Sequence, residues 1–365
     1  MRGETTKQSA MLLGVTTDEL VPRDHPMRRI RTIVESVLVE LSPQFEAMYA
    51  KHGRPSIPPE HLLKATLLMA LYSIRSERQF CERLQYDLLF KWFLDLNIGD
   101  RAFHPTTFSQ NRERLLGQDI AAAFLGEVVR EARRRRLVSE DHFTVDGTLL
   151  ESWASLKSYR PRVDQEPPKG GGRNPDVDFH GQKRSRDTHA SATDPEALLY
   201  KALLYKKGGQ AAKLYFIGHA LMENRHGLVT DIVLTKATGT AECEAALVLL
   251  DRRPFARRRV TLGADRGYDN KAFIEACRER QVTPHVAQNV SRRRSAVDGR
   301  TTHHPGYAQS LRRRKRVEEI FGWAKTVAGG RKLRYIGLRK NQMWATFTAA
   351  AYNLVRMANI EAANA

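Results

Sequence analysis

The chain has 365 residues, with 60 Lys and Arg against 41 Asp and Glu, so its formal net charge at pH 7 is +19. Its 41% hydrophobic residues are enough to bury a core, which excludes global disorder. The excess charge favours a polyanionic partner, with nucleic acid ahead of an anionic membrane surface. No stretch reaches the roughly 18 apolar residues of a membrane span, and the N-terminal segment lacks the apolar core of a signal peptide. We therefore expect no membrane partner.

The cysteines point to a reducing compartment. Cys81, Cys243 and Cys277 are isolated in the sequence, without the paired spacing of a zinc knuckle or the even number of a disulfide framework. We expect a cytoplasmic protein.

The first 137 residues favour an all-α domain. Each predicted helix starts at a residue whose side chain commonly caps a helix, and apolar residues then recur along one face. The predicted caps are Ser56, Ser76, Asp87 and Thr106 or Thr107, and a longer helix spans about 119–136. Short helices joined by tight turns are typical of a helix-turn-helix DNA reader and equally of any small helical domain. If the domain reads DNA, the helix at 107–115 is the best candidate to enter a groove, with Arg112 and Arg114 on its polar face.

Residues 138–365 change to a pattern of strands alternating with helices, which predicts a mixed sheet flanked by helices. A polar stretch at about 157–194, rich in Pro, Gly, Arg and Asp, predicts a loop or a flexible insertion. Just after it, Ala-Leu-Leu-Tyr-Lys occurs twice in tandem, which indicates a local duplication. The predicted strands are 142–150, 214–223, 228–235, 259–264 and 283–288, and the predicted helices are 241–250, 270–281, 309–326 and 342–359.

Three acidic residues stand out by their context. Asp146 lies in the middle of an otherwise apolar and β-branched strand, where a charge is costly unless it is paired or bound to a metal. Asp265 follows a buried strand, and Glu318 precedes an apolar helix face. Two carboxylates on neighbouring strands and a third on a helix suit a divalent metal. For a lone Asp in a strand, a capped turn or a salt bridge is the favoured interpretation.

Three motifs in order resemble those of bacterial insertion-sequence transposases of the DDE type, which have a ribonuclease H-like catalytic core. The first is Thr144-Val-Asp146-Gly-Thr148, and the second is Gly263-Ala-Asp265-Arg-Gly-Tyr268-Asp. The third has the family spacing of Arg314, three residues, Glu318, six residues and Lys325, which selects Glu318 over Glu319. The string from Arg314 to Lys325 is similar to the insertion-sequence-five group, and the helical N-terminus resembles the DNA-binding segment of that group.

Two features depart from the family pattern. Position 311, where the family signature has Tyr, is Leu here, and the duplicated Ala-Leu-Leu-Tyr-Lys falls where the family has a single copy. Neither departure removes a proposed metal ligand.

The resemblance implies a metal-dependent active site. Asp146, Asp265 and Glu318 would be the catalytic residues and would hold two Mg²⁺ ions, with Asp146 bridging them, and Mn²⁺ would substitute. The partners would be double-stranded DNA, both the terminal inverted repeats of the element and the target, and a homodimer or higher assembly on that DNA. Such a protein would be associated with the nucleoid.

Basic residues surround Glu318, since residues 311–340 contain 11 Lys and Arg against two Glu. We interpret Arg314, Arg316 and Lys325 as phosphate contacts. The simpler interpretation of Arg314 is an ion pair with Glu318 on the same helix face. Trp323 is either a platform for an extruded base or part of the core.

The predicted function is therefore a transposase that binds the ends of its own insertion sequence, cleaves them by metal-dependent phosphodiester hydrolysis and joins the 3′-OH ends to target DNA. One alternative is a catalytically silent relative, domesticated or decaying, that still binds DNA. A third is a ribonuclease H-like nuclease or resolvase without joining activity. The predicted architecture is a helical DNA-binding domain at 1–137 and a ribonuclease H-like α/β catalytic domain at 138–365.

Overall fold

The computed structural model describes most of the chain, and all structural statements below refer to those residues. They are residues 14–49, 56–117, 119–162, 178–179, 182–183, 188–200, 212–253, 259–291 and 294–364.

The N-terminal region is helical, as the sequence predicts. Its helices are α1 (Thr17–Leu20), α2 (Pro26–Met48), α3 (Pro59–Leu71), α4 (Glu77–Tyr86), α5 (Leu88–Phe93), α6 (Pro105–Gly117) and α7 (Ile120–Arg134). The predicted caps at Ser76 and Asp87 are confirmed, because their side chains accept hydrogen bonds from the backbone N–H groups of Gln79 and Phe90. The predicted cap at Thr106 or Thr107 is wrong, since α6 already begins at Pro105 and the His104 ring accepts from the N–H of Thr106.

The second region contains the predicted mixed sheet. Its strands run in the order β10-β9-β1-β7-β6, and β8 also pairs with β7. β1 is antiparallel to β7 and parallel to β9, β7 is antiparallel to β8, and β9 is parallel to β10. The strands are β1 (His142–Glu151), β6 (Leu198–Tyr200), β7 (Lys213–Glu223), β8 (Val229–Lys236), β9 (Val260–Ala264) and β10 (Val282–Val286).

Part of the polar stretch predicted as a loop is ordered. A short turn, η1 (Leu156–Ser158), leads into β2 (Tyr159–Pro161), which pairs with β5 (His189–Ser191), and β3 (Asp178–Phe179) pairs with β4 (Gln182–Lys183). Most of the rest of the predicted insertion lies outside the described residues. So does the whole of the second Ala-Leu-Leu-Tyr-Lys copy, at 202–206.

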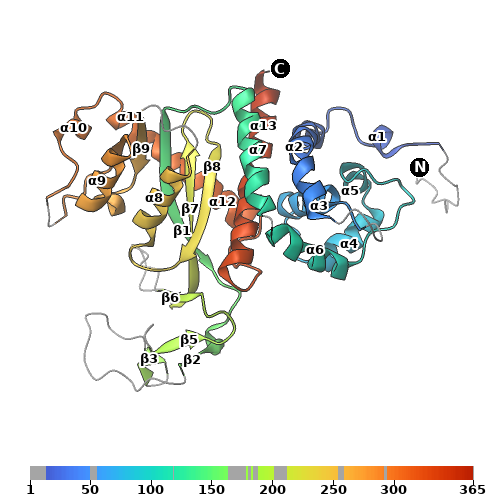
Figure 1. Cartoon of the computed structure of the whole chain (residues 1–365), viewed down its shortest axis with the longest axis horizontal. Coiled ribbons are helices and arrows are strands. Elements are labelled where there is room, and N and C mark those ends of the chain that lie inside the picture. The colour runs from blue at the N-terminus through green and yellow to red at the C-terminus, as the bar shows by residue number, and fades with distance from the viewer. Residues whose placement is uncertain are drawn as a thin grey trace, which may run out of the picture.

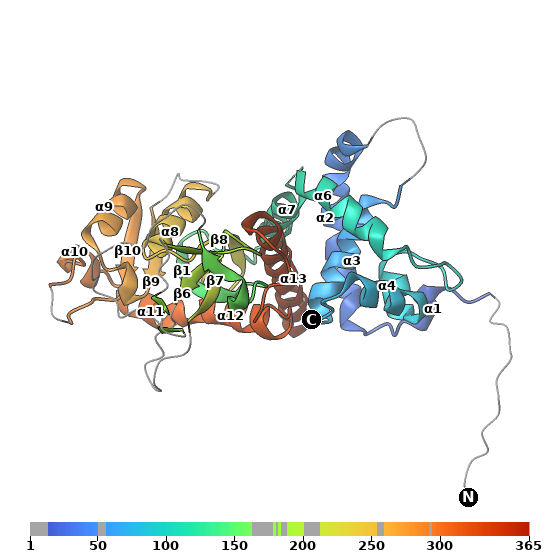
Figure 2. The same ribbon diagram turned by 90° about the horizontal axis from the view of Figure 1, so that it is seen from below.

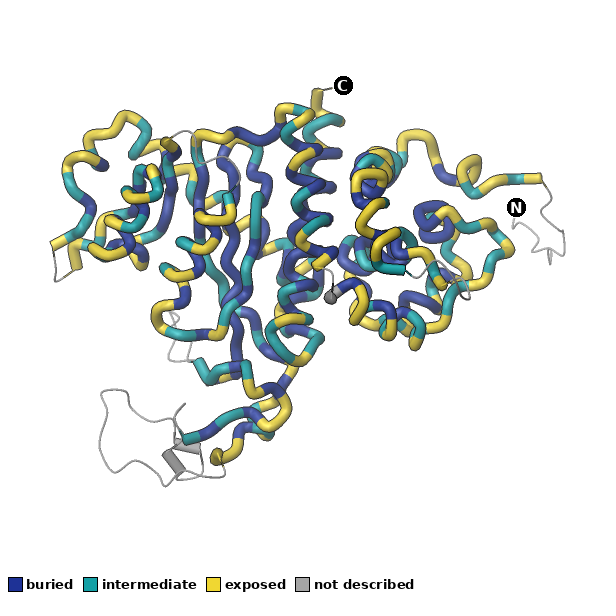
Figure 3. The backbone as a smooth tube through the Cα atoms, viewed as in Figure 1, coloured by how far each residue is buried: buried dark blue, intermediate teal, exposed yellow. Residues whose placement is uncertain are grey.

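Helices cover both faces of the sheet (Figures 1 and 2). The odd residues Phe143 and Val145 of β1 pack into a core with α8 (Ala241–Asp251) and α9 (Lys271–Glu279). The opposite face is covered by α12 (Val317–Thr326), α13 (Leu338–Asn364) and α7. This second core continues without interruption into the N-terminal helices, so one buried cluster joins the helical region to the sheet (Figure 3).

The last elements differ from the prediction in one respect. The predicted helix at 309–326 is divided into α11 (Tyr307–Arg313), a tighter turn η3 (Arg314–Arg316) and α12, while α10 (Gly299–Thr302) precedes them and η2 (Arg266–Tyr268) follows β9. The predicted helix at 342–359 lies inside the longer α13. No helix in the described ranges is long and apolar enough to cross a membrane.

Candidate active site

The parallel pairing of β1 with β9 ends just before the two predicted aspartates. Thr144 is the last residue of β1 that pairs with β9, opposite Gly263. Asp146 and Asp265 each lie two residues further along their chains, so both carboxylates come from the carboxyl end of a parallel strand pair, where ligands of such sheets collect.

Asp146 is held in an unfavourable electrostatic environment. Its side chain accepts one hydrogen bond at 2.8 Å, from the backbone N–H of Gly147. Burial, together with the neighbouring charges of Asp265 and Glu242, raises the pKa of Asp146 to about 7, while the hydrogen bond from Gly147 and the charge of Arg314 act in the opposite direction. The two predicted aspartates therefore face each other closely enough to repel.

Asp265 caps the turn that follows β9. Its Oδ1 accepts a hydrogen bond of 2.7 Å from the N–H of Gly267. A Cβ at Gly267 would lie 2.9 Å from this oxygen, so a side chain at this position would require the Asp265 carboxylate to shift, whereas its distance of 3.7 Å from Oε2 of Glu242 is an ordinary contact.

Glu242 is a further acidic residue of the cluster, and sequence reasoning did not find it. It lies in the first turn of α8, and although the residue is exposed, burial of its carboxyl end and then the charge of Asp265 raise its pKa. An acidic residue at this position is also what any helix N-terminus favours, so the sequence offers no signal that distinguishes it.

Tyr268 lies beneath these carboxylates. Its side chain is fully buried, and its hydroxyl has no hydrogen-bond partner. Burial raises the pKa of Tyr268 well above its ordinary value, followed by the charges of Asp146, Glu242 and Asp265. A buried hydroxyl without a partner is costly, so the site contains a polar atom that the protein itself leaves unsatisfied.

Glu318 and Glu319 are adjacent in α12 but have different environments. Glu319 pairs with Arg356 at 2.9 Å and accepts from the Tyr352 hydroxyl at 3.4 Å. Glu318 is exposed and makes no hydrogen bond or ion pair with any described residue. Of the two, Glu318 is the one that remains open to a ligand.

The structure brings Asp146 and Asp265 together but does not close a metal site around all three predicted ligands. Within the described residues, no three His, Cys, Asp or Glu side chains are close enough to hold a metal ion. Glu318 belongs to a helix that packs on β1, yet its carboxylate stands apart from the two aspartates.

Two of the predicted basic residues lie along β1. Lys325 donates a 2.6 Å hydrogen bond to Thr148 Oγ1, two residues from Asp146 on the same face of the strand. Burial, followed by the charge of Arg331, lowers the pKa of Lys325. Arg314 is close enough to Asp146 to act on its pKa, and it forms no ion pair with Glu318. The simpler interpretation of Arg314 is therefore wrong in this structure.

Arg316 and Trp323 have partners inside the protein. Arg316 donates to the backbone oxygens of Asn224 and Arg225, at 3.1 and 2.8 Å, which fixes the turn between β7 and β8. Trp323 is half-buried and packs edge-on against Tyr352, with ring centres 6.0 Å apart. The structure thus favours the core interpretation of Trp323 and a structural role for Arg316.

Both basic residues of the predicted recognition helix have partners within the protein. Arg112 donates to Glu77 at 2.6 Å, and its guanidinium lies over the ring of Tyr335. Only 14% of the Arg112 side chain is exposed. Arg114 is exposed but lies over Tyr49 at 4.6 Å. The prediction that Arg112 contacts DNA is at odds with this packing, because its charge already joins the helical region to the C-terminal segment.

Comparisons with known proteins agree with the arrangement of the chain. A family model described as "Transposase domain (DUF772)" matches residues 15–114, and one described as "Transposase DDE domain" matches residues 182–354. No curated protein matches. One solved structure, a cryo-EM structure of the piggyBac transposase synaptic complex with hairpin DNA, shares 9% identity over 96% of this chain and 78% of that chain. The TM-score of this match is 0.39.

Proposed function

We propose how this chain, which belongs to the DDE transposases of insertion sequences, carries out transposition: the end of its element lies along β1, and the carboxylates of Asp146 in β1 and Asp265 after β9 would hold the metal ions that cleavage requires. The observation that carries the proposal is the repulsive pair Asp146 and Asp265, whose partners in the protein do not neutralise it.

The catalytic domain has a ribonuclease H-like fold in this proposal. Its support is the strand order β8-β7-β1-β9-β10, with the first two pairs antiparallel and the last two parallel. The string from Arg314 to Lys325 supports membership of the insertion-sequence-five-like group.

The family generally uses divalent metal ions, and the residues at this site fit Mg²⁺ or Mn²⁺. Their donors are carboxylate oxygens, which hard cations prefer. A divalent cation would relieve the repulsion that raises the pKa of Asp146, and the buried hydroxyl of Tyr268 lacks a partner beside the same carboxylates. Asp146 and Asp265 would hold the ions, and Glu318 would complete the site when DNA draws α12 toward the strand ends.

When bound, two such ions would supply Lewis-acid chemistry, activating a water and stabilising the leaving 3′-oxygen. The protein's own contribution is to hold the phosphate. Arg314 lies beside Asp146, and Lys325 is fixed by Thr148 one position further along the strand face. Together they provide two positive charges on one side of the scissile phosphate, at fixed positions. In the joining step, the same groups would hold a target phosphate while the freed 3′-OH attacks it.

The proposed partners are the terminal inverted repeats and target DNA. Two ends must be held at once, so we propose a homodimer or a higher assembly on DNA. The proposed location is the cytoplasm, at the nucleoid.

The test uses a pre-cut oligonucleotide that carries the terminal repeat, a target plasmid and Mn²⁺. Nicking together with products joined to the plasmid supports the proposal. Binding without nicking or joining would indicate the catalytically silent relative. Nicking without joined products would indicate a nuclease or resolvase.

A further inference from the structure

Trp153 differs from the other tryptophans of the chain. Trp92 is buried, and Trp323 and Trp344 are half-buried against the core, whereas Trp153 is 51% exposed. A tryptophan in this position contributes little to folding, because much of its ring remains in contact with water.

Although its ring is exposed, the backbone of Trp153 is fixed on both sides. Ser152 is fully buried, and its backbone N–H donates to Leu214 O at 2.8 Å. The Ser152 hydroxyl bonds to Asp194 and accepts from the N–H of Ala154, which is also buried. Trp153 is therefore an exposed ring on an anchored bend, which is a preorganised contact surface.

Trp153 lies at the far end of the strand that carries Asp146. β9 pairs with β1 only as far as Thr144, and the next described backbone on that side is the bridge between Glu151 and Lys332. Between these two points, no described strand pairs with this edge of β1. At about 3.3 Å per residue, Asp146 and Glu151 are separated by about 17 Å along this edge.

Positive charges follow the same edge. Arg314 lies by Asp146, Lys325 is bound to Thr148, and Arg331 is close enough to Lys325 to lower its pKa. At the end of the edge, the ammonium of Lys332 lies 5.7 Å from the centre of the Trp153 ring. Lys332 is held in place because the N–H of Leu333 donates to Glu151 O at 2.7 Å.

We infer that Trp153 and Lys332 form a binding site for an unpaired DNA base, with Trp153 stacking on the base and Lys332 contacting its phosphate. Every base offers a π face, and an exposed aromatic ring beside a cation is the chemistry that binds it. Within a duplex this face is covered by the neighbouring base pairs, so the occupant is a base that is extruded or lies at a frayed end. Since a base pair advances about 3.4 Å, the site lies about five positions from the scissile phosphate.

This inference rests on the proposed function, and it assigns to Trp153 the stacking role that Trp323 does not fill in the structure. It also predicts that recognition of the cut end depends on strand separation near the site.

The test measures binding of pre-cut element ends that carry a single 2-aminopurine at successive positions, either unpaired or in a blunt duplex. We expect the wild-type protein to quench the fluorescence of one unpaired 2-aminopurine near the fifth position. Trp153→Ala should remove this quenching and weaken binding of the unpaired end about tenfold, with a much smaller effect on the blunt duplex. Trp153→Phe should retain most of the quenching, because it keeps a π face.

Tyr86→Ala is the matched control, since Tyr86 is an exposed aromatic residue of the helical region, 73% accessible. It should bind both DNAs as the wild type does, and thermal unfolding of each variant checks that the fold is intact. Equal affinity of Trp153→Ala and wild type for the unpaired end, or equal losses on both DNAs, would overturn the inference. If the wild type nicks and joins DNA but Trp153→Ala behaves normally, only the stacking site fails. If the wild type neither binds nor cuts element ends, the proposed function fails with it.

Discussion

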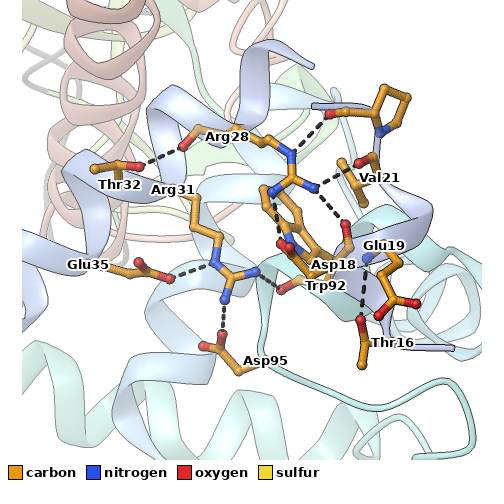
Figure 4. Close-up of polar contacts among 11 residues, drawn as sticks. Thr16, Asp18, Glu19, Val21, Arg28, Arg31, Thr32, Glu35, Trp92 and Asp95 are labelled. Atoms are coloured by element: carbon orange, nitrogen blue, oxygen red, sulfur yellow. Dashed lines mark hydrogen bonds and ion pairs between the residues drawn. The ribbon is translucent and has the colours of Figure 1, made fainter. Parts of the chain in front are cut away.

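Charged residues cluster in two regions of this molecule. In one cluster opposite charges pair, and in the other like charges lie together. In the helical region, Arg28, Arg31 and Lys64 are each matched by acids or carbonyls. Arg31 alone contacts Glu35 and Asp95, both at 2.5 Å, and Trp92 O at 2.8 Å (Figure 4). Lys64 is buried and pairs with Asp95. Where the pairing of β1 with β9 ends, the acidic residues Asp146, Asp265 and Glu242 lie near one another.

The difference indicates what each region is for. A matched network such as that of Arg31 satisfies its own charges and adds to the free energy of folding or to its specificity. In the acidic cluster, burial followed by the charge of Asp265 raises the pKa of both Asp146 and Glu242, and such a cost is expected where a ligand compensates it. What distinguishes the candidate active site from the helical region is therefore that its acidic side chains lack ion-pair partners among the described residues, and not that it contains more charges.

The largest effect is expected from neutralising either aspartate of the acidic cluster. Asp146→Asn or Asp265→Asn should lower the rate of metal-dependent nicking at least about a thousandfold, because a neutral amide is a poor ligand for Mg²⁺. Affinity for the element ends, measured by gel shift, should change little. If end binding is lost in parallel with nicking, these residues support the fold rather than the chemistry.

The next largest effect is expected from removing Asp95 from the ion-pair network of the helical region. Asp95→Ala removes the shared partner of Arg31 and the buried Lys64, so it should lower the free energy of unfolding by about 3 kcal/mol. Urea unfolding measures this, with Asp24→Ala at an exposed acid as the control. Mn²⁺ affinity of the folded protein should be unchanged, and a change of less than about 0.5 kcal/mol would show that the network is not needed for stability.

A smaller effect tests whether Glu242 belongs to the acidic cluster of Asp146 and Asp265. Glu242→Gln should weaken Mn²⁺ binding about tenfold, because it removes a negative charge beside Asp265. Glu244→Gln, two residues along the same helix and exposed, should leave the affinity unchanged. Titration calorimetry distinguishes the two variants, and equal affinities would remove Glu242 from the site.

The smallest effect is a pH dependence of stability without metal. Folded Asp146 has a pKa of about 7 against an ordinary 3.8, so between these values the folded protein binds a proton that the unfolded chain releases. Stability therefore falls as pH rises through this window. In chelator, Asp146→Asn should raise Tm relative to wild type by a few degrees at about pH 8 and by much less at about pH 4. An equal difference at both pH values would contradict the raised pKa.

The sequence predicts those features that depend on local periodicity and spacing. The five predicted strands coincide with β1, β7, β8, β9 and β10, because their alternating or continuous apolar residues are read directly from the chain. The same pattern places Asp146 in the middle of one strand and Asp265 directly after another, as the structure has them. Short strands such as β2 and β5 were not predicted, since their pairing comes from distant residues rather than from their composition.

What the sequence does not predict is which polar side chains find partners. Arg112 and Glu77 are 35 residues apart, and their ion pair depends on how α4 and α6 pack. Glu242 joins the cluster because α8 starts beside the turn after β9. The position of Trp153 depends on the bond between its neighbour Ser152 and the distant Asp194. Each of these facts is tertiary, so no motif encodes it.

The 27 residues of α13 form a continuous rod of about 40 Å that touches α2, α3, α7 and β8. Ser73, Arg75 and Arg112 also contact residues 327–335, the segment that leads into α13, and these contacts hold the helical region against the sheet domain. With so many contacts, the described residues show no hinge between the helical region and the sheet. If the helical region binds an element end, the number of base pairs between the bound sequence and the cut would be set by the dimensions of the protein.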